Sequence, residues 1–97
     1  MLTYKAMYKF LERGVHAELV DFPGVITYGE TIQEARRLLA GALVDMAETV
    51  MLRGEPLPQP DPFCTDADAD LEEPIHLLFT TTSHVSVVPR TDTHEAA

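Results

Sequence analysis

Apolar and polar residues alternate along residues 2–19, with the period of two that is typical of a β-strand with one buried face. In the first run the apolar side carries Tyr4, Ala6, Tyr8 and Phe10. In the second run it carries Val15, Ala17 and Leu19. Glu12-Arg13-Gly14 separates the two runs, and Gly14 can adopt the positive φ that a tight turn requires. The pattern predicts a β-hairpin.

A second turn follows at Asp21-Phe22-Pro23-Gly24. Pro23 fixes its own φ and Gly24 accepts a left-handed conformation, which is the combination found in a type II turn. Residues 25–28 then form a third short β pattern. The first 28 residues therefore predict a three-stranded antiparallel meander.

The apolar period changes to 3.6 residues from about Ile32 to Arg53, which predicts one long amphipathic helix packed on the meander. Thr31 and Glu34 have the spacing of a capping box, and Gly54 is a suitable residue to follow the last turn. The apolar stripe consists of Ile32, Ala35, Leu38, Leu39, Ala42, Leu43, Met46, Ala47 and Val50.

Residues 55–74 predict a connector, because prolines alternate with other residues and acidic residues follow them. Alternating prolines favour an extended polyproline II conformation over a helix or a central strand. Residues 75–88 are rich in Thr, Val, Leu and His, and predict one further strand, either continuous or bent near residues 82–84. The expected fold class is α+β with the order β-β-β-α-β. We expect a single domain over residues 1–89 and a disordered tail over residues 90–97.

The composition is strongly acidic, with 16 Asp and Glu against 7 Lys and Arg and a net charge of −9. Nucleic acid phosphates repel such a surface, whereas a cationic protein is attracted to it. The one cysteine, Cys64, excludes an internal disulfide. The chain has no apolar run of the ~18 residues that a membrane helix needs, and its first residues lack the features of a signal peptide. We therefore expect a cytoplasmic location.

Candidate metal and catalytic patterns fail on spacing. Asp66, Asp68 and Asp70 begin like a calcium-binding loop, but its sixth and twelfth positions hold Leu71 and Leu77 instead of Gly and Glu. The histidines lack zinc-site spacing: His16, His76, His84 and His94. The chain contains no GxSxG, GxGxxG or phosphate-binding loop. The sequence thus predicts a protein without enzymatic activity, cofactor or metal.

Four ordered motifs resemble the HicB family of antitoxins over roughly residues 2–60. They are Tyr4-x-Ala6, Ala17-Glu18 leading to Asp21-Phe-Pro-Gly24, Thr27-x-Gly29-Glu30-Thr31-x-x-Glu34-Ala35, and Gly54-x-Pro56-x-Pro58. The chain departs from the family pattern at the turn, where Val20 replaces a Pro and Phe22 replaces a Leu.

The resemblance implies a half ribonuclease-H-like fold and a protein that binds and inactivates HicA toxins, which are small basic mRNA-cleaving ribonucleases. Masking of the toxin active site is the expected mechanism. Nine residues follow Val88, too few for the DNA-binding segment of many HicB proteins, so we expect no direct nucleic acid binding. The alternative is an orphan homo-oligomeric domain of this type with a regulatory or small-ligand-binding role and no toxin partner.

Two surfaces follow as hypotheses. The partner-binding surface is expected around the Pro-Gly turn, although the turn could also serve only to join two strands; its residues are Glu18, Asp21, Phe22, Tyr28 and Glu30. Self-association into a homodimer or higher oligomer is expected at the last strand. The residues expected at that edge are Leu77, Phe79, Val85 and Val87.

Overall fold

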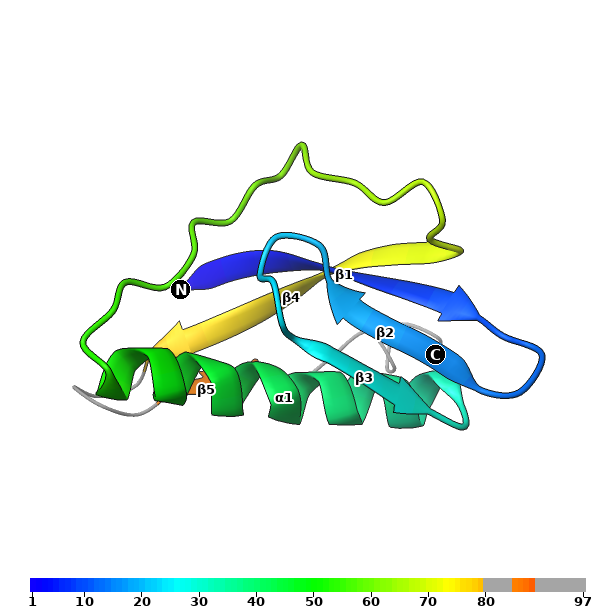
Figure 1. The fold of residues 1–97 in the computed structure, drawn as a ribbon, viewed down its shortest axis with the longest axis horizontal. Helices are drawn as coiled ribbons and strands as arrows, with labels where there is room; N and C mark the ends of the chain where they lie inside the picture. The colour runs from blue at the N-terminus through cyan, green and yellow to red at the C-terminus, as the bar shows by residue number, and fades with distance from the viewer. Residues whose placement is uncertain (80–84, 89–97) are drawn as a thin grey trace, which may run out of the picture.

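The computed structural model describes residues 1–79 and 85–88 and places a curled antiparallel sheet between a helix and a long connector (Figure 1). The sheet order is β3-β2-β1-β4-β5. Its strands are β1 (Leu2–Phe10), β2 (Val15–Leu19), β3 (Ile26–Gly29), β4 (Leu71–Phe79) and β5 (Val85–Val87). The helix α1 (Ile32–Leu52) lies along one face of the sheet, and the connector, residues 55–70, runs over the other.

The predicted hairpin and its buried face are confirmed. β1 and β2 pair from Ala6↔Leu19 to Phe10↔Val15, and the Leu11 N–H donates to the Gly14 carbonyl at 3.0 Å. Gly14 has the expected positive φ, 87°. Phe10 differs from the prediction because it occupies the last pair beside the turn and is 51% exposed. The core side chains of the hairpin are Tyr4, Ala6, Tyr8, Val15, Ala17 and Leu19.

The Pro-Gly turn also forms as its residues predict. The Val25 N–H donates to the Phe22 carbonyl at 3.4 Å, and Gly24 has a φ of 95°, as in a type II turn. Phe22 is buried, and its ring centroid lies 5.2 Å from that of Tyr4. The turn therefore closes one end of the core as well as joining β2 to β3.

The caps of α1 confirm its predicted ends to within one residue. The Glu34 N–H donates to Thr31 Oγ1 at 3.1 Å, whereas the Glu34 side chain accepts from the Glu30 N–H, one residue before the capping-box position. At the other end the N–H groups of Gly54 and Glu55 donate to the Met51 and Val50 carbonyls, at 3.0 and 3.1 Å. This is a Schellman motif. The buried stripe is Ala35, Leu39, Leu43 and Ala47.

The prediction of a single strand after the helix is wrong. β4 begins at Leu71 and pairs with β1, and β5 returns antiparallel to β4, so that Leu77 pairs with Val87. Residues 80–84, between the two strands, lie outside the described residues, and so does the bend predicted near residues 82–84. The predicted connector, residues 55–74, is also too long, because its acidic residues Glu72 and Glu73 belong to β4. The predicted tail, residues 90–97, lies outside the described part of the chain as well.

A close approach of sheet and helix depends on Gly29. This residue is buried at the end of β3, and a Cβ on it would lie 2.5 Å from the Ala35 backbone nitrogen. Only a residue without a side chain lets the end of β3 reach the first turn of α1. Within the described residues no helix has the length and apolar character needed to cross a membrane.

Candidate interaction surface

The sheet face opposite α1, here called the open face, presents a mixed set of polar and apolar side chains. The strand registers align Ile26, Glu18, Met7 and Glu72 in one row across the sheet. Met7 is buried in this row although it lies on the face away from the helix. The connector covers the open face near Lys5, and the β3 end of the sheet remains uncovered.

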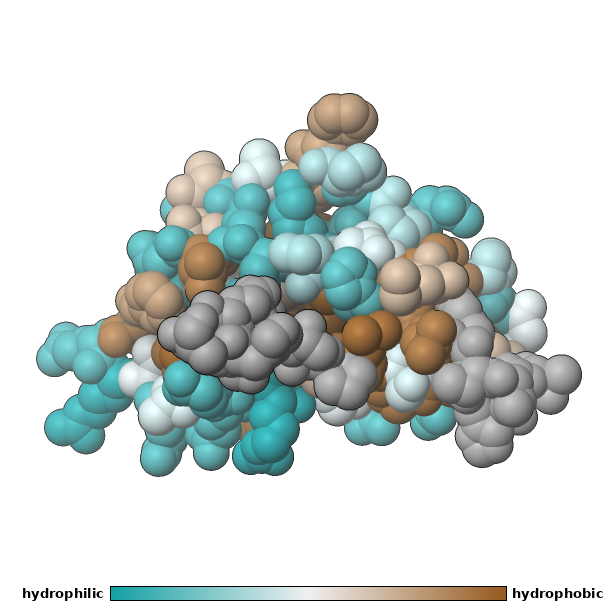
Figure 2. Space-filling view, turned by 180° about the vertical axis from the view of Figure 1, so that it is seen from behind, coloured by the Kyte–Doolittle hydropathy of each residue, from teal (hydrophilic) through white to brown (hydrophobic). Residues whose placement is uncertain are grey.

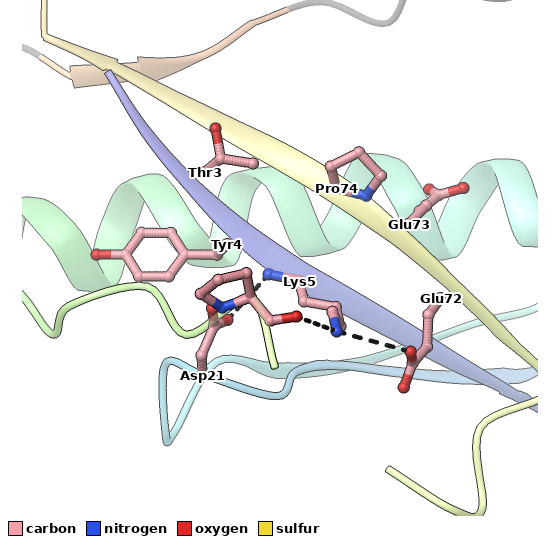
Figure 3. A pocket seen from close by; sticks show the side chains of 8 residues that line it. Thr3, Tyr4, Lys5, Asp21, Glu72, Glu73 and Pro74 are labelled. Carbon is pink, nitrogen blue, oxygen red and sulfur yellow. Dashed lines mark hydrogen bonds and ion pairs between the residues drawn. The ribbon is translucent and has the colours of Figure 1, made fainter. Parts of the chain in front are cut away.

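Several side chains of the sheet and its turns fasten the connector to the sheet. Lys5 Nζ donates to the Pro62 and Cys64 carbonyls, at 3.1 and 2.6 Å, and lies 4.0 Å from a Glu72 carboxylate oxygen (Figure 3). The Tyr4 hydroxyl donates to the Pro58 carbonyl at 2.7 Å. These contacts link residues more than fifty positions apart, so the connector follows a defined path despite its lack of regular structure.

Asp21 is a further anchor, and its carboxylate is buried. One carboxylate oxygen accepts from the Lys5 N–H and the other from the Asp61 N–H, both at 2.9 Å. The residue is 8% exposed. A single side chain thereby joins the end of β2, the middle of β1 and the connector.

Two of the groups at these anchors have shifted pKa values. Burial, together with the charge of Asp21, raises the pKa of Tyr4 to about 12, so its hydroxyl remains a donor at neutral pH. The pKa of Glu72 is lowered, first by the Asp66 N–H, then by the Thr65 hydroxyl and the Lys5 charge. Glu72 therefore remains ionised. It accepts hydrogen bonds from the Thr65 hydroxyl at 2.8 Å and from the Asp66 N–H at 3.0 Å, and so holds the second part of the connector.

A cavity of about 340 Å³ opens beside these anchors (Figure 3). Its charged rim groups are already engaged: Lys5 binds the connector, and Asp21 accepts its two backbone N–H groups. Among the described residues no group of three His, Cys, Asp or Glu side chains gathers as a metal site would require. The cavity is lined by Thr3, Tyr4, Lys5, Asp21, Pro62, Glu72, Glu73 and Pro74.

The outer side of the connector carries a chain of carboxylates around an exposed aromatic ring. Residues 61–73 contain six acidic residues and no Lys or Arg. Phe63 lies within this segment and is 90% exposed. Figure 2 shows a hydrophobic residue at the top of the molecule, where Figure 1 places the tip of the connector, with hydrophilic residues below it. We call Asp61, Phe63, Asp66, Asp68 and Asp70 the acidic ridge.

The acidic ridge is held by hydrogen bonds within the connector and by contacts with β1. Asp61 and Asp66 each accept a backbone N–H two residues further along, at 3.0 and 2.9 Å. Asp70 accepts the Phe10 N–H at 2.8 Å and lies 3.8 Å from Lys9 Nζ. Each carboxylate uses only part of its accepting capacity in these bonds, so the ridge offers further acceptors to a partner.

The predicted partner surface is only partly available. Asp21 and Phe22 are buried, at 8% and 2% exposure, and therefore have structural roles at the turn; their prediction as contact residues does not fit these positions. Glu18 is half-buried and lies 2.7 Å from His16 Nε2. Tyr28 and Glu30 are exposed. Glu18, Tyr28 and Glu30 lie at the uncovered end of the open face and at the adjoining turn into α1.

Two of the four residues predicted at the self-association edge are buried. Leu77 and Val85 are 0% and 7% exposed because the β4–β5 hairpin turns their side chains toward the core. Val87 is half-buried and packs against the same core. The side chain of Phe79 lies outside the described part of the structure. The last strands thus complete the core of a single copy.

A half-buried ion pair joins sheet and helix, and no motif in the sequence predicts it. Arg36 Nε and its terminal nitrogen donate to the two Glu73 oxygens, at 3.0 and 2.9 Å. The Tyr8 hydroxyl donates to the same carboxylate at 2.9 Å, and the guanidinium lies 5.9 Å from the centre of the Tyr8 ring. The only indication in the sequence is a cation at the border of the apolar stripe of α1. This cluster joins α1, β1 and β4.

Comparison with known proteins gives no match: no family model and no curated protein sequence matches the chain. The resemblance to HicB antitoxins therefore rests on the four motifs described above. In the structure these motifs supply the Pro-Gly turn, the first turn of α1 and the residues after its last turn.

Proposed function

We propose that this protein is a HicB-like antitoxin domain that binds a small basic mRNA-cleaving toxin of the HicA type and masks its active site. The acidic ridge is the observation that carries the proposal. It combines carboxylates in a segment without a cation with a ring that is 90% exposed. A ribonuclease surface that binds RNA phosphates has the complementary charge.

The anchors beneath the ridge would favour such an interaction. Lys5, Asp21 and Glu72 hold the connector in place before any partner arrives, so little conformational entropy is lost on binding. The net charge of −9 would raise the association rate with a cationic partner, and this effect would weaken as salt is added. Phe63 would act as the apolar anchor among the carboxylates of the acidic ridge.

The fold is compatible with the resemblance but does not decide the function. The meander and long helix form the arrangement that the family implies, and the shared residues act at its turns and caps. Such residues determine topology, which many unrelated functions use. The partner therefore has to be tested directly.

The test measures binding and inhibition together. A HicA-type toxin from the organism that encodes this chain is titrated with the full-length protein, and mRNA cleavage is followed. We expect inhibition at a one-to-one ratio and a Kd that rises with salt. Phe63→Ser and the double substitution Asp66→Asn/Asp68→Asn should each raise the Kd by about tenfold or more. Asp45→Asn, an exposed carboxylate on α1, is the matched control and should leave it unchanged. Undiminished cleavage in excess protein would refute the proposal.

A further inference from the structure

β3 forms one edge of the sheet and is hydrogen-bonded only to β2 among the described strands. The strand reads Ile26-Thr27-Tyr28-Gly29, and the whole segment from Phe22 to Gly29 contains no charged residue. Edge strands of soluble proteins usually carry charges, prolines or bulges that prevent pairing with another chain. β3 has none of these within its four residues.

The ladder shows which backbone groups of β3 point outward. The Leu19 N–H donates to the Val25 carbonyl at 3.0 Å, so Leu19 and Val25 occupy a hydrogen-bonded position of the ladder between β2 and β3. Hydrogen-bonded and non-hydrogen-bonded pairs alternate along an antiparallel ladder. Since Glu18 pairs with Ile26 and His16 with Tyr28, these are the non-hydrogen-bonded pairs. The N–H and C=O groups of Ile26 and Tyr28 therefore point away from β2.

The same two residues carry the exposed apolar side chains of this edge. Ile26 and Tyr28 lie on the open face and are 55% and 50% exposed. The Tyr28 hydroxyl donates to the Arg13 carbonyl at 2.8 Å. Its ring lies against Gly14, where a Cβ would overlap it. The ring is therefore held in position before any contact forms, which lowers the entropic cost of using it in an interface.

We propose that β3 pairs antiparallel with β3 of a second copy of this chain, centred on Thr27, so that one sheet continues through both copies. This register places Ile26 opposite Tyr28 of the second copy, as a hydrogen-bonded pair that uses the outward N–H and C=O groups of both. An aromatic side chain opposite a β-branched one is a favourable cross-strand pair, and the two-fold symmetry forms it twice.

Neighbouring residues fit this register. Thr27 meets Thr27 of the second copy on the symmetry axis, which is a favourable pair. Glu30 lies opposite Gly24 of the second copy and so avoids a like charge. The interface is self-complementary, as two-fold contacts between identical chains must be.

Charge favours a second copy over a cationic strand at this edge. β3 has no carboxylate that would attract a basic segment, and the acidic ridge lies beyond β2, beside β1 and β4. At a strand spacing of about 4.8 Å, the β1 strands of the two copies lie about 24 Å apart, well beyond the Debye length of about 8 Å at physiological salt. The repulsion between the acidic ridges of the two copies is therefore largely screened. The inference is independent of the proposed function, because the ridge remains free.

Analytical ultracentrifugation of the full chain tests the proposal with one sharp substitution. Ile26→Pro removes an outward N–H and leaves the ladder with β2 intact. We expect a wild-type dimer whose affinity increases with salt, and a dissociation constant raised by about tenfold or more in the variant. Leu52→Ser is the matched control: it removes an 88% exposed apolar side chain outside β3 and should leave the dimer unchanged. A wild-type monomer at millimolar concentration, or a dimer insensitive to Ile26→Pro, would overturn the inference.

A cross-linking experiment tests the register even if Ile26→Pro impairs folding. In a Cys64→Ser background, Thr27→Cys places two thiols at the symmetry axis, within the Cα separation that a disulfide allows. We expect a disulfide-linked dimer under mild oxidation, whereas Gln33→Cys on α1, as the matched control, should give none. Failure of Thr27→Cys to cross-link in folded protein would contradict the register. A dimer disrupted by a basic protein fragment bound at β3 would show that the edge accepts a cationic partner instead, and would also contradict the proposal.

Discussion

Asp21→Asn should release the connector, because this one carboxylate holds two backbone N–H groups from different parts of the chain. Its oxygens accept from Lys5 and Asp61 at 2.9 Å, and the residue is 8% exposed. The amide keeps the shape of the side chain but has only one accepting oxygen. One of the two N–H groups must then face an NH₂ donor.

The expected loss of stability in Asp21→Asn follows from the two hydrogen bonds that the Asp21 carboxylate accepts. A buried N–H without a partner costs about 1–3 kcal/mol, and the surviving bond loses the additional strength that a charged acceptor gives. We therefore expect the free energy of unfolding to fall by about 2–4 kcal/mol. With a urea m-value of roughly 1–1.5 kcal/mol/M for a chain of this size, the unfolding midpoint should fall by about 2 M. Native domains have only about 5–15 kcal/mol in total, so the effect is large.

Urea unfolding followed by circular dichroism measures this change, with Asp45→Asn on the exposed side of α1 as the control, which should stay within about 0.5 kcal/mol of wild type. A second measurement separates the local effect from general destabilisation. Loss of the Asp21 charge should lower the pKa of Tyr4 from about 12, although burial, the larger cause, remains. An Asp21→Asn protein with wild-type stability and an unchanged Tyr4 titration would refute the assignment of Asp21 as the anchor.

Three further predictions concern the contacts between layers. Gly29→Ala should lower stability by about 2–3 kcal/mol in thermal unfolding, because its Cβ would lie 2.5 Å from a backbone nitrogen of α1, whereas Gly41→Ala has open space and should raise stability by about 0.5–1 kcal/mol. Glu73→Gln should cost about 2–3 kcal/mol in urea unfolding, since Arg36 loses its paired carboxylate; a neutral result would contradict a structural ion pair. The raised pKa of Tyr4 favours the neutral phenol in the folded state, so stability should be full below pH 10 and fall as pH rises toward 12; Tyr4→Phe should remove that dependence in pH-jump unfolding.

The features predicted correctly from the sequence are those with local causes. The alternation of β1, the φ of Gly24 and the Thr31 cap each depend on residues within a few positions of one another. Their physical determinants are therefore visible in a short window of sequence. The strand meander and the long helix follow directly from such windows.

The errors concern residues whose partners are far away in the sequence. Glu73 looked like part of an acidic loop, but Arg36 and Tyr8 neutralise and bind it, so it fits inside a strand that packs on the helix. Asp21 was predicted as a partner-binding residue, with a structural role in the turn as the alternative, and Asp61, forty positions later, supplies one of the donors that bury it. Burial of a charge depends on such partners, and no local pattern reveals them.

Leu77 and Val85 illustrate a related difficulty. An apolar run of residues predicts a strand but does not say which faces become buried. A single strand would have left these side chains at an edge, whereas the β4–β5 hairpin turns them against α1. The apolar residues that remain exposed on an uncovered strand, Ile26 and Tyr28, belong instead to a short segment with weak sequence signal.

The acidic residues of this chain divide into two functional sets. Asp21, Glu72 and Glu73 act as internal acceptors, and removing any of them would damage the fold whether or not a partner exists. Within the acidic ridge, Asp61 and Asp66 accept N–H groups only two residues away, whereas Asp70 also binds β1 through the Phe10 N–H. Solubility alone would not favour the placement of a 90% exposed phenylalanine among them, because an exposed ring promotes association. A surface with both features fits the proposed contact with a cationic protein. The ridge mutants distinguish that contact from a role in solubility, because they should weaken binding at unchanged stability.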